Sequence, residues 1–378
     1  MTYIGSLIIS LCLFKLSEQY RPKKIKVSRK RRIILPNWFA LMAILVFAII
    51  AGLRDSSIGR DVTVYVIPVF TRASRYSSVV QVLQQHNVDI GYEILAFISS
   101  RISDDFHFFN FLTSFITISC IYCFFKRNLN GKYIVLSMFV FFCLFYNNTF
   151  NVVRQWLAIG IVAVATTTLE EKKYLKYIIG CIFASMFHIS GIVGLIYPIT
   201  SIILNKQKGR IGKTALIVAG IGIGLSFFSQ AILLLNRIGI LSVKYIDYID
   251  TSGNSSIFNQ VISRIVIIIL GVVLYEKLDK EDSNNHIIFC YLLIDLLLGC
   301  SAVLVGDASR FSLYFGIWQC VFVPRIIIVL EKLFRKEAMI LVYFLVVVYY
   351  LSYWVYCIPI RNLGSTYPYV SDIIKWLN

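Results

Sequence analysis

Charged residues are scarce in this sequence: Asp, Glu, Lys and Arg together make up 15% of its 378 residues, whereas 58% are hydrophobic. No stretch is long enough or polar enough to form a separate soluble domain. A soluble protein needs far fewer apolar residues than this to build one core. The composition therefore excludes an ordinary soluble enzyme and predicts an all-α integral membrane protein.

A recognisable metal site is also missing. Cys120 and Cys123 form a Cys-x-x-Cys pair, but the second pair and the histidines that would complete a zinc site are absent, and the chain has only four histidines. All nine cysteines lie within or beside apolar runs, where a thiol behaves as a small hydrophobic group. We therefore expect neither a metal site nor disulfide bonds.

Apolar runs separated by short charged connections recur along the whole chain. A hydrocarbon core of about 30 Å takes about 20 apolar residues per helix. No basic segment precedes the first run and no small-residue cleavage site follows it, so we expect a retained helix rather than a signal peptide. The pattern predicts about twelve transmembrane helices, at residues 1–16, 33–52, 106–125, 133–147, 149–169, 174–188, 189–204, 214–235, 261–275, 287–305, 311–330 and 338–358.

Lysine and arginine gather in every second connection between these segments, as is typical of cytoplasmic loops. The strongly basic connection 17–32 is therefore expected inside, together with the connections near 126–132, 172–176, 206–213, 277–280 and 332–336. This alternation places both termini on the extracytoplasmic (periplasmic) side. It predicts one polytopic membrane domain, 1–378, with outward loops at about 53–105, 236–260 and 359–378.

The basic residues outside the cytoplasmic connections are mostly arginines. Lysine suffices to set topology, whereas the planar guanidinium group holds phosphate or carboxylate with two parallel hydrogen bonds. An anionic ligand at the outward face is one explanation, and lipid headgroups with local ion pairs are the other. The net charge of +17 is not a nucleic-acid signature, because most of it sets topology.

Ionisable and polar side chains next to apolar helices mark candidate functional positions, because burying them in a bilayer is costly. The loop 52–61 contains two Arg-Asp pairs, Arg54-Asp55 and Arg60-Asp61, and is followed by Tyr65. A solvated loop of internal salt bridges is the alternative. The start of the fifth span carries a polar stripe that shares one helical face: Asn147, Asn151, Arg154 and Gln155. Interhelical hydrogen bonds are the alternative for Asn and Gln, but a purely structural role for Arg154 would also require an acid.

Two further clusters lie at predicted outward turns. His188 is two residues from Ser190 in the hairpin between the sixth and seventh spans, where a satisfied hydrogen-bonding histidine is the alternative. Asp307 and Arg310 are three residues apart, with Tyr314 one turn further, where a local ion pair is the alternative. By contrast, Asp295 and Arg325 fall nearer the cytoplasmic half, and we expect them to pair with each other. All four clusters fall on one predicted side of the membrane, which independent solvated charges would not require.

These residues resemble the EpsG family of exopolysaccharide and O-antigen polymerases, a relative of the Wzy-type polymerases. The matching segments run through nearly the whole chain: GLRDSSIGRDVTVY (52–65), the Asp-x-Gly-Tyr step from Asp89 to Tyr92, FNVVRQWLAIGI (150–161), SMFHIS (185–190) with Tyr197-Pro198 after it, DASRFSLYF (307–315) and a late Pro-Tyr at 368–369. One departure is Arg60, which follows Gly59 where the family has a small or hydroxyl residue.

The resemblance implies a multi-pass glycosyltransferase of the bacterial inner (cytoplasmic) membrane, with a GT-C-like arrangement and a periplasmic active face. Such a polymerase transfers the growing glycan from undecaprenyl diphosphate to the non-reducing end of another lipid-linked repeat unit. It needs no metal, nucleotide sugar or other cofactor. The expected partners are the undecaprenyl-diphosphate-linked oligosaccharide and a chain-length regulator (polysaccharide co-polymerase), with no nucleic acid.

The residues fit this chemistry as follows. Fixed guanidinium groups stabilise the negative charge that develops on a departing diphosphate, a role that we assign to Arg54, Arg154 and Arg310, with Gln155 beside them. A base must take the proton of the acceptor hydroxyl, and Asp61 and His188 are both candidates. The glycan is expected to contact a third set: Tyr65, Tyr92, Asn151, Asp307 and Tyr314.

Three other functions remain open at this point. A flippase for the same lipid-linked glycan would show internal repeats or paired Gly/Pro-broken helices, and the sequence shows neither. A membrane O-acyltransferase would take its acyl donor from inside, whereas these polar groups gather outside. An O-antigen ligase shares the substrate and the arginine chemistry but typically has a larger outward loop between late helices than the one at about 236–260.

Overall fold

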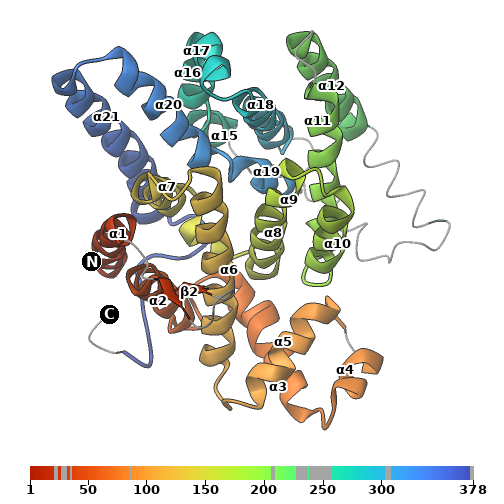
Figure 1. Ribbon diagram of the computed structural model, residues 1–378. Coiled ribbons are helices and arrows are strands. Elements are labelled where there is room, and N and C mark those ends of the chain that lie inside the picture. The colour runs from red at the N-terminus through yellow and green to blue at the C-terminus, as the bar shows by residue number, and fades with distance from the viewer. Residues whose placement is uncertain are drawn as a thin grey trace. The chain divides into compact units, whose positions relative to one another are not determined.

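The computed structural model describes residues 1–20, 24–26, 32–34, 36–85, 87–205, 209–226, 237, 257–302 and 308–374 (Figure 1). The described chain is helical apart from one antiparallel pair of three-residue strands, β1 (Lys24–Lys26) and β2 (Arg32–Ile34). It divides into two compact units. The first comprises Met1–Ile192 and Tyr343–Asn378, and the second comprises Val193–Val342.

The first unit is built around α6 (Phe106–Asn128), which packs against both α2 (Trp38–Gly52) and α8 (Val153–Ala165). On the two sides of these helices, α1 (Thr2–Gln19) packs against α2, and α10 (Tyr174–Ser185) packs against α8. The remaining elements of this unit are η1 (Val62–Val66), α3 (Ile67–Arg75), α4 (Val79–Gln85), α5 (Ile90–Ser100), α7 (Ile134–Phe141), η2 (Phe142–Tyr146), η3 (Asn147–Phe150) and α9 (Thr167–Glu170).

The close approach of α2 and α6 depends on Gly52. A Cβ atom at this position would lie 2.5 Å from the Cβ atom of Phe111 and 2.6 Å from its Cα atom. Elsewhere the core is filled by aromatic rings, such as Phe47 and Tyr146, whose centroids are 5.0 Å apart. The hydroxyl of Tyr146 donates to the carbonyl oxygen of Phe47 at 2.8 Å, which satisfies this buried phenol.

The second unit is organised around α18 (Asn284–Ser301), which packs against most of the other helices of the unit. These helices are α11 (Ile196–Leu204), α12 (Arg210–Ser226), α15 (Ile257–Ile262), α16 (Ile265–Val273), α17 (Tyr275–Glu281), α19 (Ala308–Gly316) and α20 (Gln319–Leu333). Two further helical segments contain residues of both units, η4 (Ile189–Leu195) and α21 (Lys336–Val355), and η6 (Tyr356–Ile360) belongs to the first unit.

The described part of each predicted apolar segment is mainly helical, except that residues 33–34 of the segment 33–52 belong to strand β2 and its helix begins only at Trp38. Four described helices are long and apolar enough to cross a membrane, and a fifth crossing arises if the segments of α15 to α17, bent by 76°, form one span. These helices support a membrane protein, while twelve crossings and the side of the termini stay predictions. The predicted loop 53–105 is itself largely helical, since it contains η1, α3, α4 and α5.

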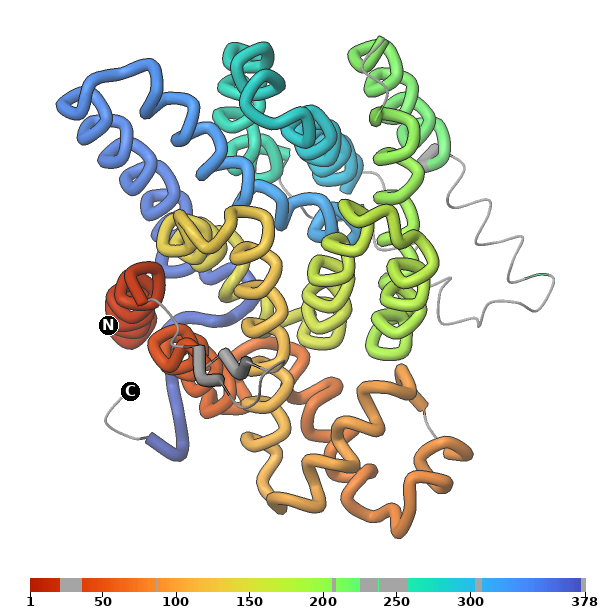
Figure 2. The backbone as a smooth tube through the Cα atoms, viewed as in Figure 1, coloured from red at the N-terminus to blue at the C-terminus, as the bar shows by residue number. Residues whose placement is uncertain are grey.

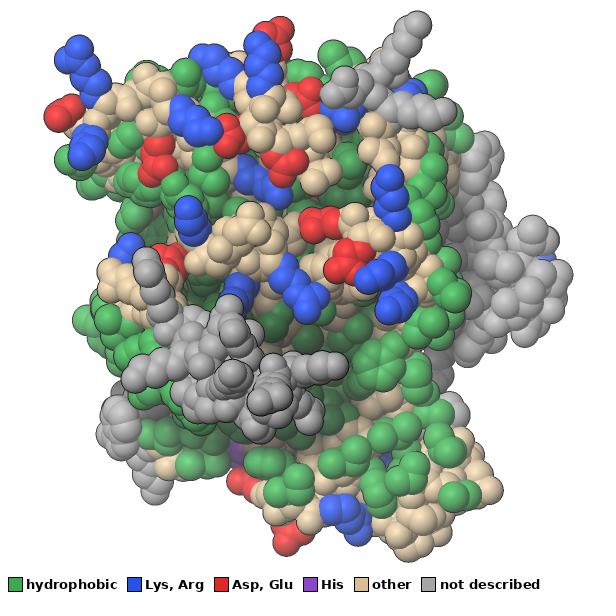
Figure 3. Space-filling view, viewed as in Figure 1, with side chains coloured by type: hydrophobic (Ala, Val, Ile, Leu, Met, Phe, Trp, Pro, Cys, Tyr) green, Lys and Arg blue, Asp and Glu red, His purple; other side chains and the backbone are tan. Residues whose placement is uncertain are grey.

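The predicted cytoplasmic connections of the second unit meet at one end of it. Arg210 donates to Asp279 at 2.7 Å, and Lys332 forms an ion pair with Glu281. Figure 3 shows Lys, Arg and acidic side chains gathering over the neighbouring ends of α17, α20 and α21. In the first unit, Arg127 donates to the hydroxyl of Thr167 at 2.7 Å, so the predicted connection 126–132 lies beside the end of the span that leads into the connection 172–176. The charge pattern along the sequence is therefore reproduced inside each unit.

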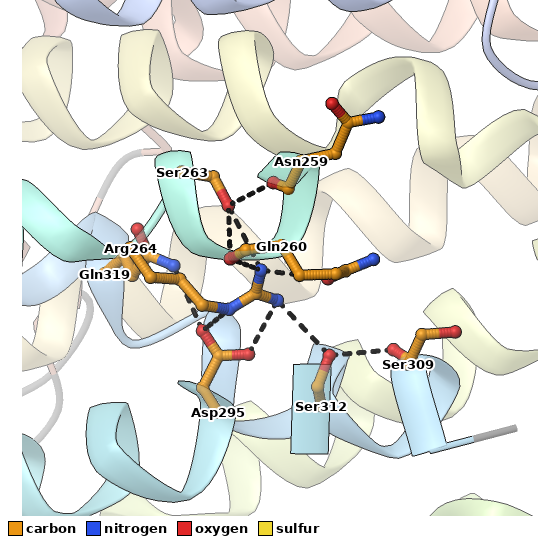
Figure 4. A network of polar contacts seen from close by, with 8 residues as sticks. All are labelled: Asn259, Gln260, Ser263, Arg264, Asp295, Ser309, Ser312 and Gln319. Carbon is orange, nitrogen blue, oxygen red and sulfur yellow. Dashed lines mark hydrogen bonds and ion pairs between the residues drawn. The ribbon is translucent and has the colours of Figure 1, made fainter. Parts of the chain in front are cut away.

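The predicted pair between Asp295 and Arg325 is wrong. Asp295 instead accepts two hydrogen bonds from Arg264, from Nε at 2.8 Å and from Nη2 at 3.0 Å (Figure 4). Arg325 pairs with Asp282 at 2.8 Å. The reason is the interruption between α15 and α16, which lies at Arg264 and places this guanidinium group against α18. Sequence spacing does not reveal which helices become neighbours.

Candidate functional site

Arg54 lies in the loop that follows α2, and it is fully buried. Its guanidinium group donates only to backbone carbonyl groups: Nε to Ile58 at 3.2 Å, Nη2 to Phe150 at 3.5 Å, and Nη1 to Ala51. The group also stacks on the ring of Phe150, with 4.5 Å from Cζ to the ring centroid. Burial lowers the pKa of Arg54 to about 10, so that the group remains charged at neutral pH. In this arrangement Arg54 fixes the shape of the loop and does not present its charge to a ligand.

The C-terminal segment crosses the same loop (Figure 2). The amide of Asp55 donates to the carbonyl oxygen of Val370 at 2.9 Å, and the hydroxyl of Ser371 donates to that of Leu53 at 2.6 Å. The hydroxyl of Tyr3 donates to the carbonyl oxygen of Thr366 at 2.6 Å. The beginning of α1 and the C-terminal segment therefore lie at the same end of the first unit as the loop, as the predicted topology requires.

Two asparagines of the predicted polar stripe hold this segment in place. Asn147 donates to the hydroxyl of Thr366 at 3.1 Å and accepts from the indole nitrogen of Trp354 at 2.9 Å. The side-chain oxygen of Asn151 accepts from the amide of Arg60 at 3.1 Å. Gly364 has a φ of +76°, and a Cβ atom there would lie 2.3 Å from the Asn151 side chain. The structure thus gives Asn151, predicted to contact the glycan, a position between the loop and the C-terminal segment.

Asp61, the first candidate base, lies at the amino end of α8 in space. Its Oδ2 atom accepts from the amide of Val153 at 2.9 Å, so a residue 92 positions earlier provides the capping interaction of this helix. Val153 also belongs to the apolar core formed by η1, α3, α4 and α5. The loop 52–61 and the start of α8 are therefore one folded unit rather than separate solvated segments.

Arg154 follows directly in the first turn of α8. It forms an ion pair with Asp89, and its Cζ atom lies 3.9 Å from the ring centroid of Tyr65. The two charged side chains are largely buried, with 13% of Arg154 and 16% of Asp89 exposed. The Nε atom of Arg154 is buried and has no hydrogen-bond partner. Asp89 supplies the acid that a structural role for Arg154 requires, and one donor of the guanidinium fork remains unused.

Asp89 precedes α5 and links Arg154 to the predicted histidine hairpin. The backbone of Ile189 donates to the Asp89 carboxylate. The amide of Gly91 donates to the carbonyl oxygen of Met186 at 2.7 Å, which fixes the hairpin against the start of α5. Burial raises the pKa of Asp89 above its ordinary value, and Arg154 opposes this shift. Asp89 is thus held where its charge depends on the arginine.

His188 lies in this hairpin and contacts Ser190. The Nδ1 atom of His188 is 2.6 Å from the hydroxyl of Ser190 and accepts from the backbone amide of Ser190 at 3.3 Å. A ring nitrogen that accepts a backbone N–H carries no proton, so a neutral His188 has its proton on Nε2. In this arrangement Nε2 is a hydrogen-bond donor, which makes His188 a weaker candidate for the base than Asp61.

Tyr92 is fully buried near these groups, and its hydroxyl has no hydrogen-bond partner. The charges of Asp61, Arg154 and Arg54 all act on this hydroxyl, which places it among them. A buried phenol without a partner is unusual, because it forgoes the hydrogen bonds that water would give it. The hydroxyl therefore keeps an unused donor and an unused acceptor.

The structure therefore brings together five of the predicted residues in the first unit: Asp61, Tyr65, Tyr92, Arg154 and His188. Gln155 is buried on α8 directly after Arg154. Arg310 and Tyr314 belong to α19 of the second unit, where Tyr314 is buried and its carbonyl oxygen accepts from Tyr197. Their meeting with the first unit stays a prediction, and Asp307 lies outside the described residues.

Two acids of this site were given no role from the sequence. In the sequence Asp89 stands out only as part of the Asp-x-Gly-Tyr motif, although it is the ion-pair partner of Arg154. Glu93 is fully buried and accepts from Arg72 and from the amide of Asn87 at 2.9 Å. Its signal was an isolated acid inside the apolar run of α5, which requires a partner when buried. Among the described residues, no group of three His, Cys, Asp or Glu side chains could hold a metal ion.

No curated protein and no solved structure is significantly similar to the chain. The model of the EpsG family, in contrast, matches residues 37–371. The matched region includes the loop after α2, the Asp89 step, the start of α8, the His188 hairpin and the C-terminal segment that crosses the loop. Because the match extends over nearly the whole sequence, the chain belongs to the EpsG family.

Proposed function

We propose that this protein is a polysaccharide polymerase that transfers a growing glycan from undecaprenyl diphosphate to the non-reducing end of another lipid-linked repeat unit. The reaction takes place at the outer leaflet of the cytoplasmic membrane. Membership of the EpsG family supports an exopolysaccharide polymerase-type function in general. The observation that carries the proposal is the meeting of four distant sequence segments around the pair of Arg154 and Asp89.

Arg154 is the side chain best placed to bind the diphosphate. Bond cleavage leaves negative charge on the diphosphate, and a fixed guanidinium group with an unused donor stabilises that charge without rearranging. Tyr65 stacks on the guanidinium group, and Asp89 forms an ion pair with it. The assigned partners of Arg154 are Gln155, and Arg310 from the second unit. Arg54 is a positioning residue in this scheme, because its donors already hold the loop.

The transfer step involves one bond formed and one bond broken. The acceptor hydroxyl oxygen attacks the anomeric carbon of the donor sugar, and the bond from that carbon to the diphosphate oxygen breaks. The lipid diphosphate leaves with the electron pair, and the hydroxyl proton goes to the carboxylate of Asp61. His188 donates a hydrogen bond from Nε2, and the hydroxyl of Tyr92 binds the glycan.

A reconstitution experiment tests the proposal. Purified protein in liposomes is incubated with the lipid-diphosphate oligosaccharide alone, without nucleotide sugar, and the glycans are separated by size. A ladder spaced by one repeat unit is the expected result. Movement of unchanged oligosaccharide between leaflets would instead identify a flippase. Transfer to a different acceptor, with no ladder, would identify an O-antigen ligase.

A further inference from the structure

A second polar site lies in the first unit, on the helices between η1 and α5. It is a depression of about 690 Å³, within the size range of ligand pockets. Its lining residues come from α3, α4 and the connection to α5: Arg72, Arg75, Tyr76, Gln81, Gln85 and Asn87. All of these side chains are polar or carry a polar group. An apolar, lipid-facing groove does not fit this lining.

The electric charge of this depression is positive. Arg72 pairs with the buried Glu93, and its Nε atom is buried without a hydrogen-bond partner. Arg75 is exposed, and no ion pair joins it to another described residue. The depression therefore offers one uncompensated guanidinium group, that of Arg75, which suits a carboxylate or a phosphate.

The backbone around Arg75 is held rigidly. Arg101 donates from Nη2 to the carbonyl oxygens of Ser74 at 2.9 Å and Tyr76 at 3.2 Å, the two neighbours of Arg75. Arg101 is itself stacked on the ring of Phe97, with 4.7 Å from Cζ to the centroid. Because Arg101 fixes both carbonyl groups, the backbone of Arg75 has a defined position before any ligand binds. This lowers the entropy cost of binding.

The amide side chains favour a saccharide over a lipid headgroup. The side-chain oxygen of Gln81 accepts from the amide of Ser77 at 2.8 Å, which leaves its NH₂ group as a donor. Gln85 and Asn87 each supply both a donor and an acceptor. A sugar hydroxyl uses both kinds of group, whereas the phosphate group of a lipid only accepts. The ring of Tyr76 forms part of the wall, since its hydroxyl donates to the carbonyl oxygen of Gln85 at 3.2 Å.

The depression is connected to the candidate site through Glu93. Its Oε1 atom accepts from the amides of Asn87 at 2.9 Å and Val88 at 3.2 Å, and the next residue is Asp89, the partner of Arg154. We infer that this depression binds an acidic sugar of the glycan, with Arg75 contacting its carboxylate. The inference rests on the proposed function in one respect, namely that the acidic sugar belongs to the repeat unit of the glycan. Binding of the sugar does not itself require polymerisation.

Binding of a tetragalacturonate tests the inference. The full-length protein in phosphatidylcholine nanodiscs is titrated with this acidic probe and, separately, with its methyl ester, in which the charge is masked. We expect the acidic probe to bind about tenfold more tightly than the ester. Arg75→Gln should lower the affinity for the acidic probe to that for the ester, and it should leave the affinity for the ester unchanged. Arg361→Gln, which removes an exposed arginine that does not line the depression, is the matched control.

Three results would overturn the inference. The wild type could bind the two probes equally well, Arg75→Gln could bind the acidic probe as tightly as the wild type does, or Arg361→Gln could lose as much affinity for the acidic probe as Arg75→Gln. A fourth is the disappearance of binding when phosphatidylglycerol replaces phosphatidylcholine, because a lipid headgroup would then occupy the depression. Since no turnover is measured, these results are independent of ladder formation. A protein that binds the acid but forms no ladder keeps this site and loses the polymerase assignment.

Discussion

Arginine side chains have two different roles in this protein. Arg54, Arg101 and Arg264 are held by groups of the protein itself, the first two through backbone carbonyl oxygens and the third through Asp295. Arg154 and Arg75 instead keep donors or charge that the described residues do not satisfy. The sequence does not distinguish the two roles, since all five residues are arginines outside the basic connections. Burial and neighbouring groups decide which role each arginine has.

Arg154→Lys tests the bidentate role. Lysine keeps the positive charge but loses both the planar fork and the stacking on Tyr65, so ladder formation should fall by about 10- to 100-fold. The control is Arg127→Lys, at the opposite end of the first unit, where the arginine donates to the hydroxyl of Thr167. Polymer yields and chain lengths are compared at equal protein levels. Wild-type yields from Arg154→Lys would remove this residue from diphosphate binding.

The choice of base is tested by two conservative variants. Asp61→Asn keeps an oxygen that can accept from Val153, so the fold should survive, whereas turnover should fall by about 100-fold or more because the base is lost. His188→Gln keeps a donor near the Nε2 position and should remain within about tenfold of the wild type. Single-turnover rates with both variants are the measurement. The opposite order of the two losses would assign the base to His188.

At the scale of the helix, small residues decide how closely elements approach. Gly52→Ala should destabilise the protein by about 1–3 kcal/mol, because the new Cβ atom would overlap with the backbone of α6 at Phe111. Gly5→Ala on α1 has no atom within 4 Å of the new group, so it should be neutral or slightly stabilising. Denaturation of the purified variants in mixed micelles compares the two. Equal stabilities would mean that α2 and α6 are less tightly packed than described.

Helix positions were predictable from the sequence, because an apolar run in a membrane protein satisfies its backbone hydrogen bonds only as a helix. The helices within the segment 53–105 could not be predicted, since they are short and mixed in polarity. The candidate residues at the loop, at α8 and in the hairpin could be selected because they are polar beside apolar runs. Their partners could not: Asp89 and Asp282 are joined to Arg154 and Arg325 by packing alone.

At the scale of the whole molecule, charge along the chain predicts which ends of helices share a side of the membrane. One end of the first unit holds the loop 52–61, the start of α8 and the C-terminal segment. Arg127 contacts Thr167 at the other end of α8. Inside the second unit, Arg210 and Asp279 bring two basic connections together. These contacts agree with the predicted alternation and leave its orientation in the membrane to experiment.

Cysteine labelling measures that orientation. In a variant whose nine native cysteines are replaced by alanine, Ser57→Cys should react with an impermeant maleimide in intact cells, because its loop is predicted to face outward. Lys172→Cys and Lys277→Cys, both exposed and each in a basic connection, should react only after the cells are permeabilised. Three predicted spans separate positions 57 and 172, and four separate 172 and 277, so the two lysine positions must behave alike. If either of them reacts in intact cells, the number of crossings between the positions is wrong, and the candidate site loses its predicted access to the outer leaflet.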